Sequence, residues 1–393
     1  MPLVCHDGGM DGESFDAFAG QLRRYVRERL IPAEPDVLAA DRVPDAILAE
    51  MRSLGLFGIT VPEAYGGAGM NVSQYVETIR LLAHAAPAYR SAISISVGMV
   101  CSALKSAGTE AQKQAWLPRI AAGMITSFAL TEPGSGSDSA GLQTRAVRDG
   151  DGWVLSGTKR YITNAPMAEL ALVMARTKPE RLPGNAHVSA FLVPMDRPGI
   201  RVGTPDRKMG QAGSQIADII LDEVRVGPEA LLGGTEGTGF RAAMQSLDNG
   251  RLSVAAAATG YARRILGTAT RYATEREAFG EPIANFQLIQ AMLADSEAEI
   301  YAAECMLADA CRLADSGRRI TIEAAAAKMF ASEMCGRVAD RCVQVHGGAG
   351  YLAEYEAERL FRDARLYRIY EGTTKILQLV MARAMLKAMA AEV

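Results

Sequence analysis

The sequence predicts an α+β protein of three parts, with helices at both ends of the chain and a β domain between them. Apolar residues recur at helical spacing near the N-terminus. The middle holds short runs rich in Val, Ile and Leu with no helical period between them, which is typical of an antiparallel sheet or barrel. Long helical patterns return from residue 239 onward. We therefore expect an N-terminal α-helical domain at 1–124, a middle β domain at 125–235 and a C-terminal helical bundle at 236–393.

The N-terminal part is expected to be helical except for one turn-rich break. Apolar residues three and four positions apart, with charges between them, predict the first helix, and Pro32 ends it. Glycines and a proline between residues 60 and 69 predict a loop. The last helix of this part is almost wholly apolar or small, so it should be buried. The expected helices are 15–30, 47–56, 72–82 and 90–104.

Strands are expected in the middle part. Residues 145–148 and 153–155 flank Gly150-Asp151-Gly152, which predicts a hairpin with a tight turn. The other strand candidates are 170–175, 188–193, 200–202 and 216–226. No glycine-rich stretch of the chain fits the Gly-x-Gly-x-x-Gly pattern that opens a helix after a strand, so a Rossmann domain is not expected.

Long helices are expected in the C-terminal part. Apolar and small residues step by three or four from Phe286 to Ala314, which is long enough for a helix of a bundle. Alanine-rich stripes on these helices would let them approach one another closely.

Composition excludes several classes of function. The chain has 393 residues, 49% of them hydrophobic, and a net charge of −3, which offers nothing to a nucleic acid. No apolar run reaches the ~20 residues that a membrane-spanning helix needs. Residues 1–13 lack the pattern of a signal or transit peptide. The six cysteines lack Cys-x-x-Cys spacing and the four histidines are scattered, so we expect reduced thiols, no metal site and a cytoplasmic location.

One carboxylate near the C-terminus stands in a setting suited to proton abstraction. Glu371 lies between Tyr370 and Gly372, and Thr373 and Thr374 precede an apolar run that predicts a helix. The glycine permits a tight turn, and the threonine hydroxyls can cap the helix. Partial desolvation beside the tyrosine should raise the pKa of Glu371 toward the range useful to a general base. A solvated glutamate in a helix-capping turn would explain this stretch equally well on its own.

Two glycine-rich stretches favour the catalytic interpretation. The first, from Ala129 to Gly141, combines glycines with hydroxyl residues, so a planar or phosphorylated ligand could approach its backbone closely. The second runs from Gln344 to Tyr351. Together with the Glu371 turn, these stretches make three patterns. Their order and separations are far more specific than any one pattern alone.

These stretches together resemble the acyl-CoA dehydrogenases, a family of FAD-dependent flavoenzymes. The resemblance covers about residues 15–389 and includes both glycine-rich signatures of the family. It implies an N-terminal helical domain, a middle β domain and a C-terminal four-helix bundle. It also implies α,β-dehydrogenation of an acyl-CoA to the trans-2-enoyl-CoA, in which Glu371 takes the α-proton, FAD takes the β-hydride, and an electron-transferring flavoprotein receives the electrons.

The resemblance leaves little room for a second candidate base. Some branches of the family place the base in the segment that matches Leu247 to Arg251. Here the matching position is Gly250, which has no side chain, so the resemblance assigns the base to Glu371.

The family's flavin contacts carry over onto several segments of the chain. Tyr161 stands where the family often has Trp, which leaves stacking on the flavin possible, and Lys375 stands where the family usually has a polar residue. Gln287 and the stretch 344–348 match contacts made across a subunit boundary, which implies a homotetramer. The expected FAD contacts are Phe128, Leu130, Thr131, Gly136, Ser137, Tyr161, Ile162, Thr163, Arg276, Phe279, Gln287, Gln344, Gly347, Gly348, Thr373 and Lys375.

The family's substrate contacts carry over in the same way. The expected contacts with the acyl-CoA are Ser137, Asp248, Arg251, Tyr370 and Arg383. Ordinary salt bridges on a helix surface would also explain Arg251 and Arg276. The acyl tail is expected between the helix 90–104 and the helix that follows Arg251. A branched residue at Ile95 should shorten this cleft, which favours short or short-branched acyl groups of roughly four to six carbons.

Three alternatives remain beside dehydrogenation of an acyl-CoA. An acyl-CoA oxidase or flavin monooxygenase of the same fold would react with oxygen, although those branches tend to alter the base that is intact here. A second alternative acts on acyl groups tethered to a carrier protein. The third is a non-enzymatic scaffold or nucleic-acid-binding protein, which would need a basic C-terminal extension that the last residues, Ala388 to Val393, do not supply.

Overall fold

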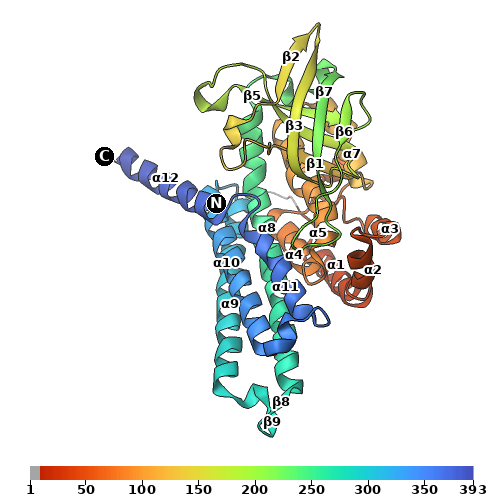
Figure 1. Cartoon of the computed structure of the whole chain (residues 1–393). Helices are drawn as coiled ribbons and strands as arrows, with labels where there is room; N and C mark the ends of the chain where they lie inside the picture. The colour runs from red at the N-terminus through yellow and green to blue at the C-terminus, as the bar shows by residue number, and fades with distance from the viewer. Residues whose placement is uncertain (1–8, 393) are drawn as a thin grey trace.

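The computed structural model describes residues 9–392, and its elements follow the predicted order of helices, sheet and helices (Figure 1). This order confirms the predicted architecture, whereas the domain boundaries at 124/125 and 235/236 stay predictions. The first eight residues of the segment 1–13, including Cys5, lie outside the described residues. Within the described residues, no helix is long and apolar enough to cross a membrane. The same residues contain no cluster of three or more His, Cys, Asp or Glu arranged to hold a metal ion.

Seven α-helices form the described portion of the N-terminal part, from residue 9 onward. The predicted first helix is α1 with a π-helical continuation, Val26–Leu30. The predicted helix 90–104 is also composite, because a π-helical segment, Ile95–Val100, separates α5 from α6. Single π-turns within a helix are frequent at functional sites. The helices are α1 (Gly12–Tyr25), α2 (Glu34–Ala40), α3 (Asp45–Ser53), α4 (Val72–Leu82), α5 (Pro87–Ser94), α6 (Cys101–Ala107) and α7 (Glu110–Ala121).

The middle part is a seven-stranded sheet in the order β1-β4-β2-β3-β7-β6, with β5 paired to β4. The predicted hairpin is β2 and β3, joined at Gly150-Asp151. The sheet is mainly antiparallel, as predicted, although β1 and the end of β2 run parallel to β4. The hairpin lies between β1 and β4 in the chain, so a long connection allows the parallel pairing. The strands are β1 (Thr126–Ala129), β2 (Arg145–Asp149), β3 (Gly152–Thr163), β4 (Leu170–Arg176), β5 (Val188–Pro194), β6 (Ile200–Val202) and β7 (Ile216–Val226).

Three long helices and one short helix pack as the C-terminal bundle. They are α8 (Gly239–Glu275), α9 (Gln287–Asp315), α10 (Thr321–His346) and α11 (Glu356–Ala364). A small hairpin of β8 (Glu277–Ala278) and β9 (Glu281–Pro282) lies at the end of the bundle remote from the sheet (Figure 1). The last helix, α12 (Thr374–Glu392), projects from the body of the molecule (Figure 1).

Shared hydrophobic cores hold the three parts against one another. One core contains residues of α1 to α5 together with residues of α8 to α11, and a second joins α6 and α7 to the sheet and to the start of α8. The helix α8 therefore takes part in both cores, near its start in the second core and from Leu252 onward in the first.

Candidate active site

Glu371 lies in a strained turn at the start of α12. Its φ of 54° is in the left-handed region, as is the φ of 98° at Gly372. A non-glycine residue seldom adopts this conformation, and such strain is concentrated at functional sites. The Lys328 ammonium of α10 donates a hydrogen bond to the Gly372 carbonyl oxygen at 2.7 Å. Thr373 caps the helix, accepting from the Ile376 N–H at 3.4 Å. The predicted turn and cap are therefore present.

The Glu371 carboxylate points at Gly250 of α8. Its Oε2 atom is buried and accepts no hydrogen bond. A Cβ atom added to Gly250 would overlap this oxygen, so the two positions cannot both carry a side chain in the present conformation. Burial of a charged oxygen without a partner is costly, and a carboxylate in this state is ready to accept a proton.

Opposing effects set the pKa of Glu371. Burial raises the pKa, and three nearby cations, Arg90, Lys328 and Arg251, partly offset the rise, with a net increase above the ordinary value. This direction agrees with the expectation from sequence. Burial also lowers the pKa of Lys328, to about 8, yet the side chain remains mostly an ammonium at physiological pH.

Asp248 and Arg251 lie beside this carboxylate on α8. The Arg251 guanidinium donates to the Asp248 carboxylate at 2.7 Å, and the Thr321 hydroxyl of α10 donates to the other oxygen of Asp248 at 3.1 Å. A salt bridge between neighbouring turns is therefore present, as expected if Arg251 only forms an ordinary salt bridge of the helix. The arginine is buried, however, and its Nε has no hydrogen-bond partner, which a surface salt bridge would not explain.

Residues from β1 and β3 come together on one side of the sheet. The Arg160 N–H donates to the Thr131 carbonyl oxygen at 2.8 Å, and the Ser127 hydroxyl donates to the Thr163 carbonyl oxygen at 2.9 Å. These bonds bring the predicted flavin contacts at 128–131 next to those at 161–163. A β-bulge between Lys159 and Ile162 gives Tyr161 a φ of 58° and leaves 55% of it exposed. Bulges often turn a side chain outward beside an active site.

A buried ion pair anchors the first glycine-rich stretch. Glu132 accepts a hydrogen bond from the buried Lys159 at 2.7 Å and others from the backbone N–H groups of Gln143 and Thr144. The segment after it is exposed at Gly136 and Ser137, and a Cβ at Gly136 would meet nothing. The loop is thus fixed at its base and open along its outer face.

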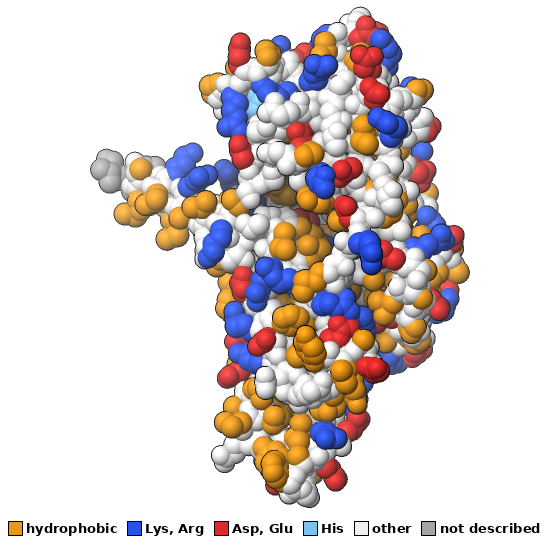
Figure 2. All heavy atoms as spheres, in the orientation of Figure 1, with side chains coloured by type: hydrophobic (Ala, Val, Ile, Leu, Met, Phe, Trp, Pro, Cys, Tyr) orange, Lys and Arg blue, Asp and Glu red, His pale blue; other side chains and the backbone are white. Residues whose placement is uncertain are grey.

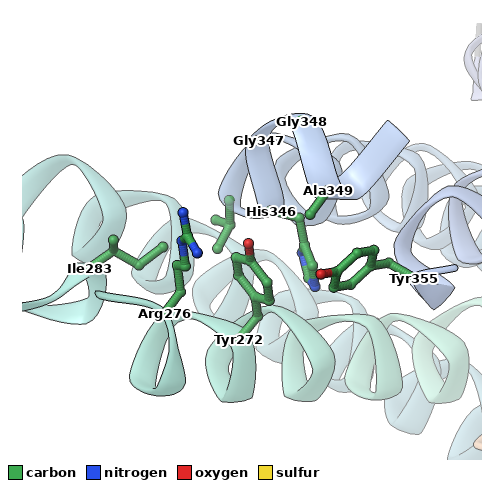
Figure 3. Close-up of a pocket in the computed structure, with 9 residues that line it drawn as sticks. Tyr272, Arg276, Ile283, His346, Gly347, Gly348, Ala349 and Tyr355 are labelled. Atoms are coloured by element: carbon green, nitrogen blue, oxygen red, sulfur yellow. The ribbon is translucent and has the colours of Figure 1, made fainter. Parts of the chain in front are cut away.

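A second group of predicted flavin contacts forms a separate pocket of about 440 Å³. Arg276 from the end of α8 points toward the backbone of Gly347 and Gly348, and His346 stacks on Tyr272 with ring centroids 4.0 Å apart (Figure 3). Along α8, Gly250 and Arg276 are 26 residues apart, or about 39 Å at 1.5 Å per residue. This pocket is therefore remote from Glu371 within one chain.

The remaining predicted contacts are exposed and scattered. Phe279 occupies the turn of the β8–β9 hairpin, with a φ of 55° and 96% exposure. Gln287 and Gln344 are exposed at the ends of α9 and α10 nearest the pocket. Lys375 and Arg383 are exposed on α12, and the structure does not bring Arg383 to the turn at Glu371.

Sequence reasoning missed the two buried cations that face Glu371 from other helices. Arg90 is 4% exposed in α5, and Lys328 is fully buried in α10. Neither belongs to a motif. The available signal was a single charge inside a helix that is otherwise apolar or alanine-rich, because such a charge is seldom buried without a function or a partner.

Models of the acyl-CoA dehydrogenase N-terminal, middle and C-terminal domains match residues 12–124, 127–224 and 237–386. The chain belongs to the acyl-CoA dehydrogenase family. It is 41% identical over 367 residues to a probable acyl-CoA dehydrogenase, YngJ, of Bacillus subtilis (strain 168), covering 93% of this chain and 96% of that one. It is 38% identical over 370 residues to CarC, a subunit of the caffeyl-CoA reductase-Etf complex of Acetobacterium woodii, covering 93% and 97%.

A solved structure of a family member contains the reduced cofactor. Glutaryl-CoA dehydrogenase from Mycobacterium smegmatis in complex with FADH2 matches this acyl-CoA dehydrogenase with a TM-score of 0.88 and 31% identity, covering 96% of this chain and 95% of that one. The family depends on FAD, and the protein is an FAD-dependent oxidoreductase.

The described residues fit a flavin dinucleotide in two parts. Tyr161 is exposed beside β1 and a Cβ on Gly136 would meet nothing, so a ring could pack against Tyr161 and the loop backbone. The Arg276 pocket offers a guanidinium and glycine backbone, which suit phosphate oxygens. When bound, FAD supplies the hydride acceptor that no side chain can provide.

Proposed function

We propose that this acyl-CoA dehydrogenase converts an acyl-CoA thioester to the trans-2-enoyl-CoA, with Glu371 as the base that removes the α-proton. The carboxylate with a raised pKa and an unpaired, buried Oε2 beside Gly250 carries the proposal. By analogy with the family, the Glu371 backbone N–H polarises the thioester carbonyl, because an α-proton becomes acidic only when developing enolate charge is stabilised. Asp248 and Arg251 hold the CoA side of the substrate.

The acyl tail is proposed to lie between α5 and α8. Ile95 is half-buried and begins the π-helical segment, so its branched side chain limits the depth of this cleft. This supports a short or short-branched acyl group, roughly four to six carbons long.

Oxidation of a series of acyl-CoA thioesters tests the proposed function. The FAD-loaded enzyme should reduce a dye acceptor with short acyl-CoA substrates and release one trans-2-enoyl-CoA per two electrons. The kcat/KM should change about tenfold per methylene near its maximum, because one methylene is worth ~1–3 kcal/mol. If no acyl-CoA reduces the flavin, the proposed dehydrogenase activity is contradicted. A maximum at twelve carbons or beyond would contradict only the short cleft.

Electrons are proposed to leave through an electron-transferring flavoprotein. The similar CarC protein is named as a subunit of a complex with Etf, which supports this acceptor. We also propose a cytoplasmic location. The support is that the five described cysteines are free, and four of them are buried.

A homotetramer is proposed as the assembly that completes the flavin site. The Arg276 pocket is about 39 Å along α8 from Gly250, too far for one dinucleotide to contact both within a chain. Hydrophobic side chains also gather on the projecting α12 and at the tip that carries β8 and β9 (Figure 2). Exposed apolar patches of this kind mark interfaces between proteins.

The assembly prediction is that Arg276→Ala loses FAD although the residue is remote from Glu371. Removing a guanidinium that pairs with phosphate should weaken FAD binding by about tenfold or more. Sedimentation of the parent protein should show a tetramer that releases FAD when it dissociates on dilution. A monomer that retains one FAD per chain would contradict the shared site.

A further inference from the structure

A buried polar cluster lies in the cleft assigned to the acyl tail. We define the Arg90 cluster as Tyr75 of α4, Arg90 and Ser94 of α5, and Ser253 of α8. All four residues are more than nine-tenths buried. The Arg90 guanidinium donates to the Ser253 hydroxyl at 2.8 Å and makes a long contact of 3.5 Å with the Tyr370 hydroxyl. The cluster thus bridges α5 and α8 immediately beside the residue that precedes Glu371.

Three side-chain polar atoms of the Arg90 cluster have no hydrogen-bond partner. The Arg90 Nε, the Ser94 hydroxyl and the Tyr75 hydroxyl are all buried without a hydrogen-bond partner. Ser94 follows Arg90 by one helical turn, so their side chains share a face of α5. Gly98, one turn further along, leaves the space that the Tyr75 hydroxyl occupies. Three donors therefore converge from two helices with no acceptor supplied by the described residues.

The charge balance around Glu371 is also unequal. Three cations act on this single carboxylate, and Arg251 has Asp248 as its ion-pair partner. Arg90 has only neutral hydroxyls within hydrogen-bond distance among the described residues. An arginine that shares one carboxylate with two other cations is costly to bury, so an anion supplied by a ligand would stabilise it. Proton transfer to Glu371 would make the imbalance larger.

We propose that the acyl group of the substrate carries a second carboxylate, which the Arg90 cluster binds. This inference rests on the proposed dehydrogenation and specifies its substrate as the monothioester of a short dicarboxylic acid. The guanidinium would pair with the distal carboxylate, and the Ser94 and Tyr75 hydroxyls would donate to its oxygens. The α-proton passes to Glu371 and the β-hydrogen leaves as hydride to FAD, while the distal carboxylate is unchanged. The short distance from Tyr370 to Arg90 limits the acid to a few carbons.

Flavin reduction by matched thioesters tests the inference. The FAD-loaded enzyme is mixed anaerobically with succinyl-, glutaryl- and adipyl-CoA, and separately with butyryl-, isobutyryl- and hexanoyl-CoA. At least one dicarboxylic thioester should give a kcat/KM about tenfold or more above the best monocarboxylic one. In Arg90→Met this preference should fall by about 10²-fold, since one partner of a buried charged pair is lost. Arg90→Lys should restore part of it, because the charge remains without the planar fork.

The control variant is Arg52→Met, which removes an equal charge from an exposed position on α3 and should leave the preference unchanged. Retention of FAD shows that an Arg90 variant is folded, and the preference is a ratio of two kcat/KM values, so a general loss of activity does not alter it. The inference would be overturned if only monocarboxylic thioesters reduced the flavin, or if the preference were unchanged in Arg90→Met. Either result would leave the proposed dehydrogenase activity standing. Failure of every thioester to reduce the flavin would overturn both.

Discussion

Replacement Glu371→Gln should abolish most turnover while the protein keeps its FAD. Glutamine has nearly the shape of glutamate but cannot accept the α-proton, and a positioned general base contributes about 10²–10⁴ to the rate. The kcat measured with a dye acceptor should therefore fall by that factor. The flavin spectrum and the affinity for an enoyl-CoA should change little, since the turn held by Lys328 and Gly372 remains.

A matched control for this change is Glu354→Gln, which neutralises an exposed carboxylate near the second glycine-rich stretch. Its kcat should equal that of the parent. A Glu371→Gln enzyme with more than about a tenth of the parent kcat would show that another group removes the proton.

Replacement Gly250→Ala should be nearly as damaging, although it adds only one methyl group. The new Cβ would overlap Oε2 of Glu371, so the carboxylate must move away from the substrate or α8 must shift. Overpacking of this kind costs about 1–3 kcal/mol, and displacement of a base lowers the rate steeply. We expect kcat to fall by about 10²-fold, measured with the same dye assay.

The control for this effect is a second glycine on the same helix. A Cβ added to Gly267 of α8 would meet nothing, so Gly267→Ala should keep full activity and gain slightly in thermal stability from the better helix former. Equal kcat values for the two alanine variants would contradict the contact between Gly250 and the base.

The arrangement of elements was largely predictable because it depends on local patterns. Apolar periodicity placed α4 and β7 at their observed bounds. The parallel pairing of β1 with β4 was missed, since the choice of a strand's neighbour depends on contacts distant in sequence and no local pattern records it. The π-helical segment after Ser94 was missed for a similar reason, because its residues read as an ordinary apolar helix.

The candidate site was predictable where short motifs define it and hidden where it depends on packing. The motifs pointed to Glu371, to the β1 and β3 segments and to the Arg276 pocket. They did not show that Glu371 has left-handed backbone or that its carboxylate faces Gly250, because these follow from the docking of α8 against the turn. Arg90 and Lys328 approach from two further helices and form no pattern with Glu371 in the chain.

The role of Glu371 is tested most directly by the rate of flavin reduction in anaerobic rapid mixing with a short acyl-CoA, measured over a range of pH. Only the ionised carboxylate can accept the α-proton, and burial raises the pKa of Glu371. The parent rate should therefore fall about tenfold per pH unit below that pKa. Lys328, with a pKa of about 8, stays protonated over this range. We predict that Glu371→Gln reduces its flavin at least about 10²-fold more slowly and without this acid limb. Flavin reduction in the variant at the parent rate, or with the same acid limb, would contradict the assignment of Glu371 as the base.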